Sequence, residues 1–204
     1  MLLLNVQPKT QANIQESIEI FDKLIAQNPD DDTGVSARYF LARVYHIHAF
    51  TPDLPKAEKL YRDLFDTHPE TFYGQLALVK YSLLCMYSCA DFENLPQRLA
   101  ELEPLGAKLT NPPMIRDFNQ VLGDAYQRFK ISDEKAMEHL LVAESVGYQS
   151  YRARADITMV IAQLAERLGK RSLAIEQYEI FARTFARDDR AFTAEQRLDA
   201  LRRP

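Results

Sequence analysis

The feature that most constrains the fold of this chain is a short pattern of large and small residues that recurs at long intervals. A large apolar residue is followed by a small residue and, three positions after the small one, by another packing residue. The pattern occurs three times, at Leu41-Ala42…Tyr45, Leu122-Gly123…Tyr126 and Ile161-Ala162…Ala165. Small side chains let two helices approach closely. Recurrence of such a unit is typical of helical repeat proteins.

A second pattern alternates with the first. A small residue is followed by a bulky residue four positions later, an apolar residue seven later and a proline twelve later. It occurs as Ser17, Phe21, Leu24 and Pro29, and again as Ala57, Tyr61, Leu64 and Pro69. The proline lacks a donor N–H and stops the helix that precedes it. The two patterns predict paired helices, here called first and second helices after the pattern they carry.

Apolar residues recur at helical spacing in about ten segments, and no segment has the alternation of a β-strand. The expected helices cover residues 12–28, 35–48, 53–68, 71–89, 112–129, 132–146, 151–168, 172–186 and 191–202, with a short or bent helix between 91 and 113. Asp53 and Asn111 are expected as N-terminal caps, and Gly147 and Gly169 as C-terminal caps. The sequence therefore predicts an all-α chain.

The repeats diverge between residues 91 and 113. The small residues expected to open the second helices are Ser17, Ala57, Ala100, Ala136 and Ala174. After Ala100, Pro104 stands where a bulky residue is expected, and a proline inside a helix costs about 3 kcal/mol or more. We expect a single repeat domain over residues 1–204, with four to five repeats and a capping helix over 190–204.

Composition excludes several functions. A net charge of −4 and a pI near 5.6 argue against nucleic-acid binding, because phosphate contacts need clustered Lys and Arg. No segment approaches the roughly 18 apolar residues that a membrane span requires. Cys85 and Cys89 lie four apart on one helical face, where a disulfide is disfavoured. We expect both thiols to be free and buried, which favours a reducing compartment such as the cytoplasm.

The histidines form no catalytic or metal-binding pattern. His46 and His48 are two apart and point to opposite faces of a helix, which makes them a poor metal pair. His68 precedes Pro69 at a helix end and fits a capping role, and His139 is expected at a solvated or interfacial position. No phosphate-binding glycine loop or nucleophile elbow is present. We therefore expect no enzymatic activity, no metal site and no cofactor.

The two patterns resemble those of the tetratricopeptide repeat (TPR) family, whose units are helix–turn–helix pairs of about 34 residues. The best-matching stretch is 158–189, in which the residues at family positions are Ile161, Ala162, Gly169, Ala174 and Tyr178. Ala186 replaces the family's proline, and the repeats are longer than in the family. The resemblance implies a right-handed superhelical solenoid. HEAT-like repeats and an ordinary helical bundle are the alternatives.

In the TPR family, first helices line a concave groove that holds an extended peptide or a partner helix. Carried over by position, the resemblance implies these groove residues: Tyr39, Arg43, His46, Tyr73, Lys80, Gln120, Asp124, Gln127, Met159, Gln163 and Glu166. One subset of the family clamps a terminal carboxylate with Lys and Asn. Gln120 and Asp124 stand at those two positions here, and Met159 and Gln163 stand at them in a later repeat, so such a clamp is disfavoured.

The resemblance implies a non-enzymatic scaffold that binds another protein or a peptide segment. The alternative is a structural spacer or oligomerisation segment of a larger protein, which could belong to a bacterial envelope. The helix over 12–28 reads as a second helix with no first helix before it. Its apolar face is expected either to be covered by residues 1–6 or to associate with another chain, and the chain could also be a piece of a longer protein.

Overall fold

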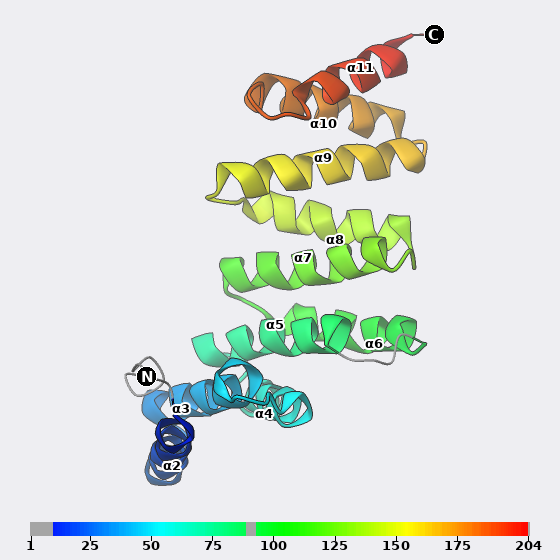
Figure 1. Cartoon of the computed structure of the whole chain (residues 1–204). Helices are drawn as coiled ribbons and strands as arrows, with labels where there is room; N and C mark the ends of the chain where they lie inside the picture. Colours follow the sequence, from blue (N-terminus) through cyan, green and yellow to red (C-terminus); the bar gives the residue numbers. More distant parts are fainter. Residues whose placement is uncertain (1–9, 89–92, 204) are drawn as a thin grey trace. The chain divides into compact units, whose positions relative to one another are not determined.

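The computed structural model describes residues 10–88 and 93–203, and within these ranges every regular element is a helix (Figure 1). The elements are α2 (Gln11–Gln27), α3 (Asp32–Arg43), the π-helix η1 (Val44–His48), α4 (Leu54–Thr67), α5 (Phe72–Tyr87), α6 (Leu95–Leu102), the 3₁₀-helix η2 (Glu103–Lys108), α7 (Pro112–Arg128), α8 (Asp133–Val146), α9 (Tyr151–Arg167), α10 (Arg171–Thr184) and α11 (Ala191–Arg202). The predicted all-α helical repeat fold is confirmed.

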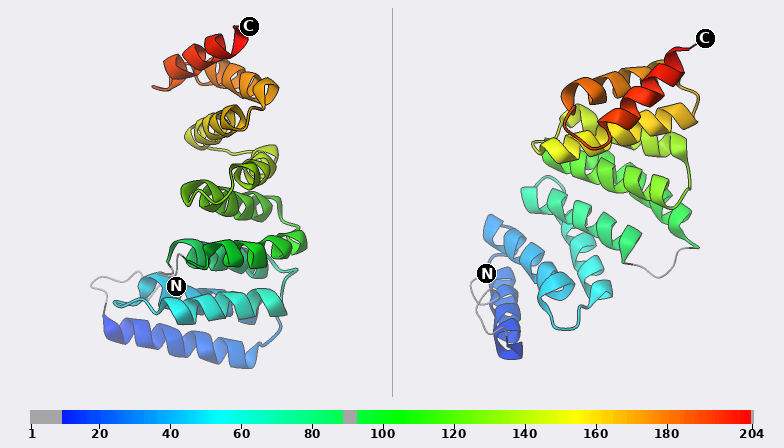
Figure 2. Two further views of the ribbon diagram at one scale, coloured as in Figure 1. Left: turned by 90° about the vertical axis from the view of Figure 1, so that its right-hand side faces the viewer. Right: turned by 45° about the horizontal axis from the view of Figure 1, so that its top comes forward.

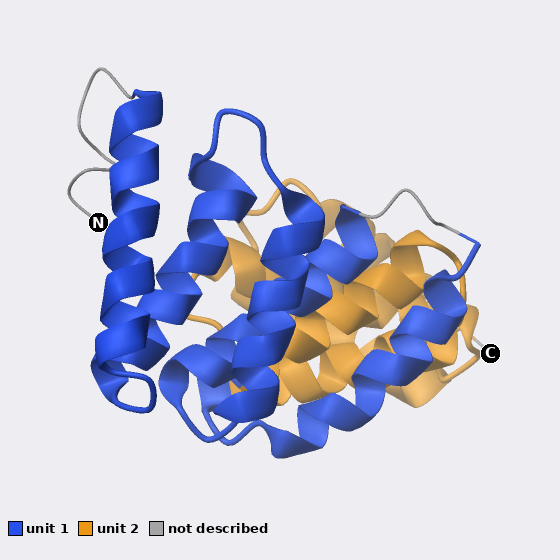
Figure 3. Cartoon of the chain, turned by 90° about the horizontal axis from the view of Figure 1, so that it is seen from below, with its two compact units in different colours: residues 1–114 blue, residues 115–204 orange. Residues whose placement is uncertain are grey.

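The chain divides into two compact units, residues 1–114 (unit 1) and 115–204 (unit 2), coloured blue and orange in Figure 3. The boundary falls inside α7, after Met114. A single domain over 1–204 with a superhelical winding stays a prediction. The expected cover of α2 by residues 1–6 lies outside the described residues, as does Cys89.

Unit 1 is built from helices that pack in chain order. α2 packs on α3, α3 on α4, α4 on α5 and α5 on α6, and the first helices α3 and α5 also contact each other. Two apolar clusters fill the spaces between these helices. The first lies between α2 and the segment formed by α3 and η1, and consists of Ile14, Phe21, Ala37, Leu41 and Val44. The second lies among α3, α4 and α5, and consists of Val35, Tyr39, Ala42, Ala57, Tyr61, Leu64, Ala77 and Leu84. Both sequence patterns therefore supply core residues.

Glycines allow the close approach that joins successive helix pairs in unit 1. A Cβ atom at Gly34 would overlap the carbonyl oxygen of Asn28, and one at Gly74 would overlap that of His68. Asn28 and His68 are the C-terminal caps of α2 and α4. Each glycine therefore lets the start of a first helix contact the backbone at the end of the preceding second helix.

The start of α7 is tied to α5 through one buried amide. The Gln75 side chain donates to Thr110 Oγ1 at 2.8 Å, and its Oε1 accepts from the N–H groups of Thr110 at 2.9 Å and Asn111 at 2.8 Å. These bonds satisfy the backbone N–H groups of Thr110 and Asn111, which have no hydrogen-bond partner within a helix. They fix the segment that follows the divergent repeat.

The divergent repeat has the short helix that its proline predicts. α6 has eight residues, and Pro104 lies in the first turn of η2, where a missing N–H is tolerated. The prediction for Ala100 is wrong, because Ala100 is exposed and Leu99 is buried in its place. The other small residues at this repeat position are buried: Ser17, Ala57, Ala136 and Ala174.

Most predicted helix caps are confirmed. Asp53 Oδ1 accepts from the N–H of Lys56 at 3.1 Å, and Gly147 and Gly169 have φ values of 88° and 67°. The prediction for the Asn111 side chain is wrong, because its Oδ1 is buried and accepts no hydrogen bond from the described residues. The next two residues are prolines without N–H groups, and the N–H of Met114 donates to the Asn111 backbone oxygen at 3.0 Å.

A π-helical turn, η1, follows α3, and the sequence patterns do not predict it. The N–H of Ala49 donates to the oxygen of Val44 at 2.8 Å, five residues earlier. Such turns are rare and frequently occur at functional sites. This turn changes the helical register after Val44 and sets the direction of His46.

Unit 2 continues the same packing. α8 packs on α9, α9 on α10 and α10 on α11, and both views of Figure 2 show α10 beside α11. Gly123 on α7 faces Leu140 on α8, where a Cβ atom would lie 2.7 Å from Leu140 Cγ. The core of the unit is fully buried aromatic and aliphatic residues, among them Phe118, Leu140, Tyr178, Phe181 and Phe185.

Candidate functional site

In unit 1, the predicted groove residues gather on α3, η1 and α5. The Tyr39 and Tyr73 rings lie 5.3 Å apart between centroids, and Tyr39 lies 5.7 Å from Tyr61. Tyr39 is only 3 % exposed, so its prediction as a ligand-contacting side chain is wrong. It packs between two other tyrosines, and its ring is part of the core. Tyr73 is partly exposed beside it.

Three basic side chains lie close together on this surface. Arg43, His46 and Lys80 are each partly exposed, and within the described residues neither Arg43 nor Lys80 forms an ion pair or a side-chain hydrogen bond. The His46 ring contacts the hydroxyl of buried Tyr61, with Nδ1 and Oη 3.4 Å apart. Burial lowers the pKa of His46, and the charges of Lys80 and then Arg43 lower it further. At neutral pH this cluster therefore holds two positive charges beside an uncharged imidazole.

In unit 2, α7 places Gln120, Asp124 and Gln127 on one face, each partly exposed. Burial raises the pKa of Asp124 to about 6, and a side-chain interaction with Gln120 opposes part of that shift. Within the described residues, no Lys or Arg forms an ion pair with Asp124. A carboxylate that is partly removed from water without a cationic partner is unusual in a folded protein.

On α9, only one of the three predicted residues remains available to a partner. Met159 is 3 % exposed and belongs to the core, so its prediction is wrong. Glu166 accepts from the Tyr178 hydroxyl at 2.9 Å and pairs with Arg197, so it faces α10 and α11. Gln163 is exposed. The prediction therefore assigned the wrong side of α9 to the groove at Met159 and Glu166.

The face of α9 that meets α7 carries residues that the sequence reasoning missed. Ala153, Asp156, Ile157 and Val160 recur at helical spacing, and together with Leu140 of α8 they line a pocket against Gln120 and Asp124. The pocket has a volume of about 220 Å³. Ala153, Asp156, Val160 and Gln163 follow a 3-4-3 spacing that is visible in the sequence.

Other polar surfaces are internally paired. A pocket of about 190 Å³ on α4, α5 and α6 contains Glu58 and Arg98, which pair at 4.0 Å. Buried Cys85 also contacts Glu58, with Sγ and Oε1 3.7 Å apart. His139 bonds to Asn119 at 2.8 Å, which places it at an interface between helices.

Residues 10–88 and 93–203 contain no candidate metal site and no candidate membrane span. No three His, Cys, Asp or Glu side chains there are grouped so that they could hold a metal ion. No helix there is both long enough and apolar enough to cross a bilayer.

Replacing Asp124 by Asn is expected to stabilise the protein at pH 7. The folded-state pKa of Asp124 lies above the unfolded value, so its contribution to stability is present below about pH 4 and lost as the pH rises through about 6. At about 1.4 kcal/mol per pKa unit, the rise from 3.8 to about 6 corresponds to a gain of about 3 kcal/mol at pH 7, most of which disappears near pH 4. Urea unfolding at both pH values measures it, and equal stabilities at pH 7 would contradict it.

No protein-family model matches the chain, and no curated protein is similar to it. Among solved structures, it is similar to a thermophilic TPR protein of Thermus thermophilus, with 17 % sequence identity and a TM-score of 0.48. The match covers 93 % of this chain and 91 % of that one.

Proposed function

We propose that the chain is a non-enzymatic binding module that holds a segment of another protein against its first helices. The observation that carries this proposal is the basic cluster on the first helices of unit 1. Arg43 and Lys80, on α3 and α5, lie near the His46 ring, and neither forms an ion pair with a described residue. Unpaired charges held at a surface by a rigid scaffold are the groups that a partner can use.

The chemistry of the two units favours a polar partner. Unit 1 offers the cations of Arg43 and Lys80 and the partly exposed ring of Tyr73, and unit 2 offers the amides of Gln120 and Gln127 and the carboxylate of Asp124. Aromatic and arginine side chains are common centres of binding energy in protein interfaces. Unit 1 would therefore match an acidic group of a partner, and unit 2 a basic or amide group.

Affinity capture tests the proposal. A tagged chain is used to isolate binding proteins from lysates, which quantitative mass spectrometry then identifies. Lys80→Ala combined with Gln120→Ala is expected to reduce specific capture about tenfold, because each substitution removes a partner-facing polar group. The matched control combines Lys59→Ala and Gln196→Ala, two exposed residues of α4 and α11, and should leave capture unchanged. Equal capture by both double variants would refute the assigned surface.

A second candidate function is self-association through α2. This helix packs on α3 and η1, and Ile20 on it is 42 % exposed. An exposed apolar side chain of this kind suits a spacer or oligomerisation segment. Sedimentation velocity of the chain and of Ile20→Lys tests the candidate: a dimer that the substitution dissociates would support it, and a monomer at all concentrations would exclude it.

A further inference from the structure

The pocket between α7, α8 and α9 of unit 2 is lined by both apolar and polar side chains. Leu140, Ile157 and Val160 are among its apolar residues, and Gln120, Asp124 and Asp156 are its polar ones. Its volume of about 220 Å³ is large enough for one long side chain. The pocket lies wholly within unit 2, so its geometry depends on that unit alone.

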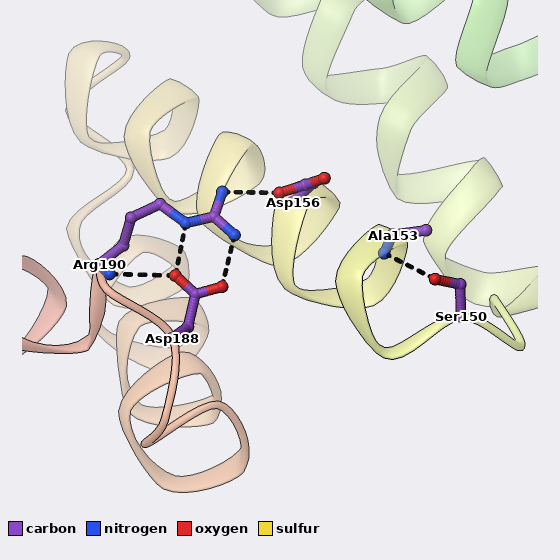
Figure 4. Close-up of polar contacts among 5 residues, drawn as sticks. All are labelled: Ser150, Ala153, Asp156, Asp188 and Arg190. Atoms are coloured by element: carbon purple, nitrogen blue, oxygen red, sulfur yellow. Dashed lines mark hydrogen bonds and ion pairs between the residues drawn. The ribbon is translucent and has the colours of Figure 1, made fainter.

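The second carboxylate on the pocket is already neutralised. Asp156 Oδ1 lies 2.8 Å from Arg190 Nη1, and Arg190 also binds Asp188 at 2.7 Å, so the guanidinium lies between two carboxylates (Figure 4). The Asp156 side chain is 52 % exposed and lies toward solvent. Asp124 is therefore the carboxylate of this pocket that lacks a cation among the described residues.

A cation is the group that completes such a site. Partial burial penalises the ionised carboxylate of Asp124, and a positive charge within hydrogen-bonding distance would offset that penalty. The Gln120 side chain lies close to Asp124 and already interacts with it. An arginine fork favours a carboxylate with both oxygens free, whereas the ammonium of lysine is a compact point charge that one oxygen can bind.

We propose that this pocket receives a lysine side chain of a partner protein, with its aliphatic stem against Ile157 and Val160 and its ammonium group on Asp124. Lysine stems pack well on apolar surfaces while the charged end binds a polar group. This inference rests on the proposed function and adds to it the identity of one anchoring residue of the partner.

The test uses a probe that needs no partner protein. The ¹⁵N-labelled chain is titrated with Nα-acetyl-lysine methylamide and, in parallel, with the norleucine analogue, which has a stem of similar length and no charge. The lysine probe is expected to shift the side-chain amide signals of Gln120 and the backbone signals of Ile157 and Val160. Norleucine should bind at least about tenfold more weakly and shift them correspondingly less, because it lacks the ammonium group that bonds to the carboxylate.

Variants separate the pocket from general electrostatics. Asp124→Asn keeps the shape of the side chain and should weaken the lysine probe about tenfold or more. Glu138→Gln, an exposed charge on α8, should leave its binding unchanged. Equal shifts from both probes, no shift at Gln120, or equal weakening by the two substitutions would each overturn the lysine assignment. None of these outcomes bears on whether the first helices capture a partner, which the capture experiment decides separately.

Discussion

Gly74→Ala is expected to lower the free energy of unfolding by about 3 kcal/mol or more. The new Cβ atom would overlap the backbone oxygen of His68 and lie 2.8 Å from its carbonyl carbon. Backbone atoms cannot rotate away as a side chain can, so α5 would have to move from the end of α4. Urea unfolding followed by circular dichroism measures the loss.

A matched control is available in unit 2. Gly169 has a φ of 67°, and a Cβ atom added there would meet no other atom within 4 Å. Asparagine adopts that backbone conformation readily. Gly169→Asn is therefore expected to change stability by less than about 1 kcal/mol. A Gly74→Ala protein as stable as the control would show that the contact between α4 and α5 is looser than described.

Tyr61→Ala is expected to cost about 3–5 kcal/mol, in the range found for large aromatic residues removed from a core. Tyr61 is completely buried at the bulky position of the second pattern. Its ring packs against Tyr39, and its edge meets the ring of His46. Thermal and urea unfolding both measure the loss.

The conservative change Tyr61→Phe separates packing from the hydroxyl contact. It retains the ring and removes only the oxygen that lies 3.4 Å from His46 Nδ1, so it is expected to cost about 1 kcal/mol or less. A loss as large as that of Tyr61→Ala would mean that the polar contact, rather than ring packing, holds η1 against α4.

The helices and their pairing could be predicted because they depend on local sterics. Small residues such as Ala42 and Gly123 mark the places where helices touch, and the prolines after α2 and α4 mark their ends. The same reasoning failed at Ala100, because the short helix α6 leaves room for Leu99 to fill the core instead. Pattern spacing alone does not fix which of two adjacent residues faces inward.

The candidate site was less predictable because it depends on rotation about each helix axis. Met159 and Tyr39 have side chains that suit either a groove or a core, and packing against neighbouring helices buries both of them in the core. The π-helical turn after α3 shifts the register at His46 without any sequence signal. The pKa of Asp124 is raised by burial beside residues of α8 and α9. The sequence pattern within α7 carries no information about these neighbours.

Lysine labelling of the chain with and without a captured partner tests most directly whether the first helices form the binding surface. Lys80 on α5 is partly exposed and Lys59 on α4 is exposed, so both can be acetylated. At saturating partner, acetylation of Lys80 should slow several-fold, while that of Lys59 stays unchanged. Protection of Lys59 with Lys80 still reactive would place the partner on the second helices and contradict the proposed function.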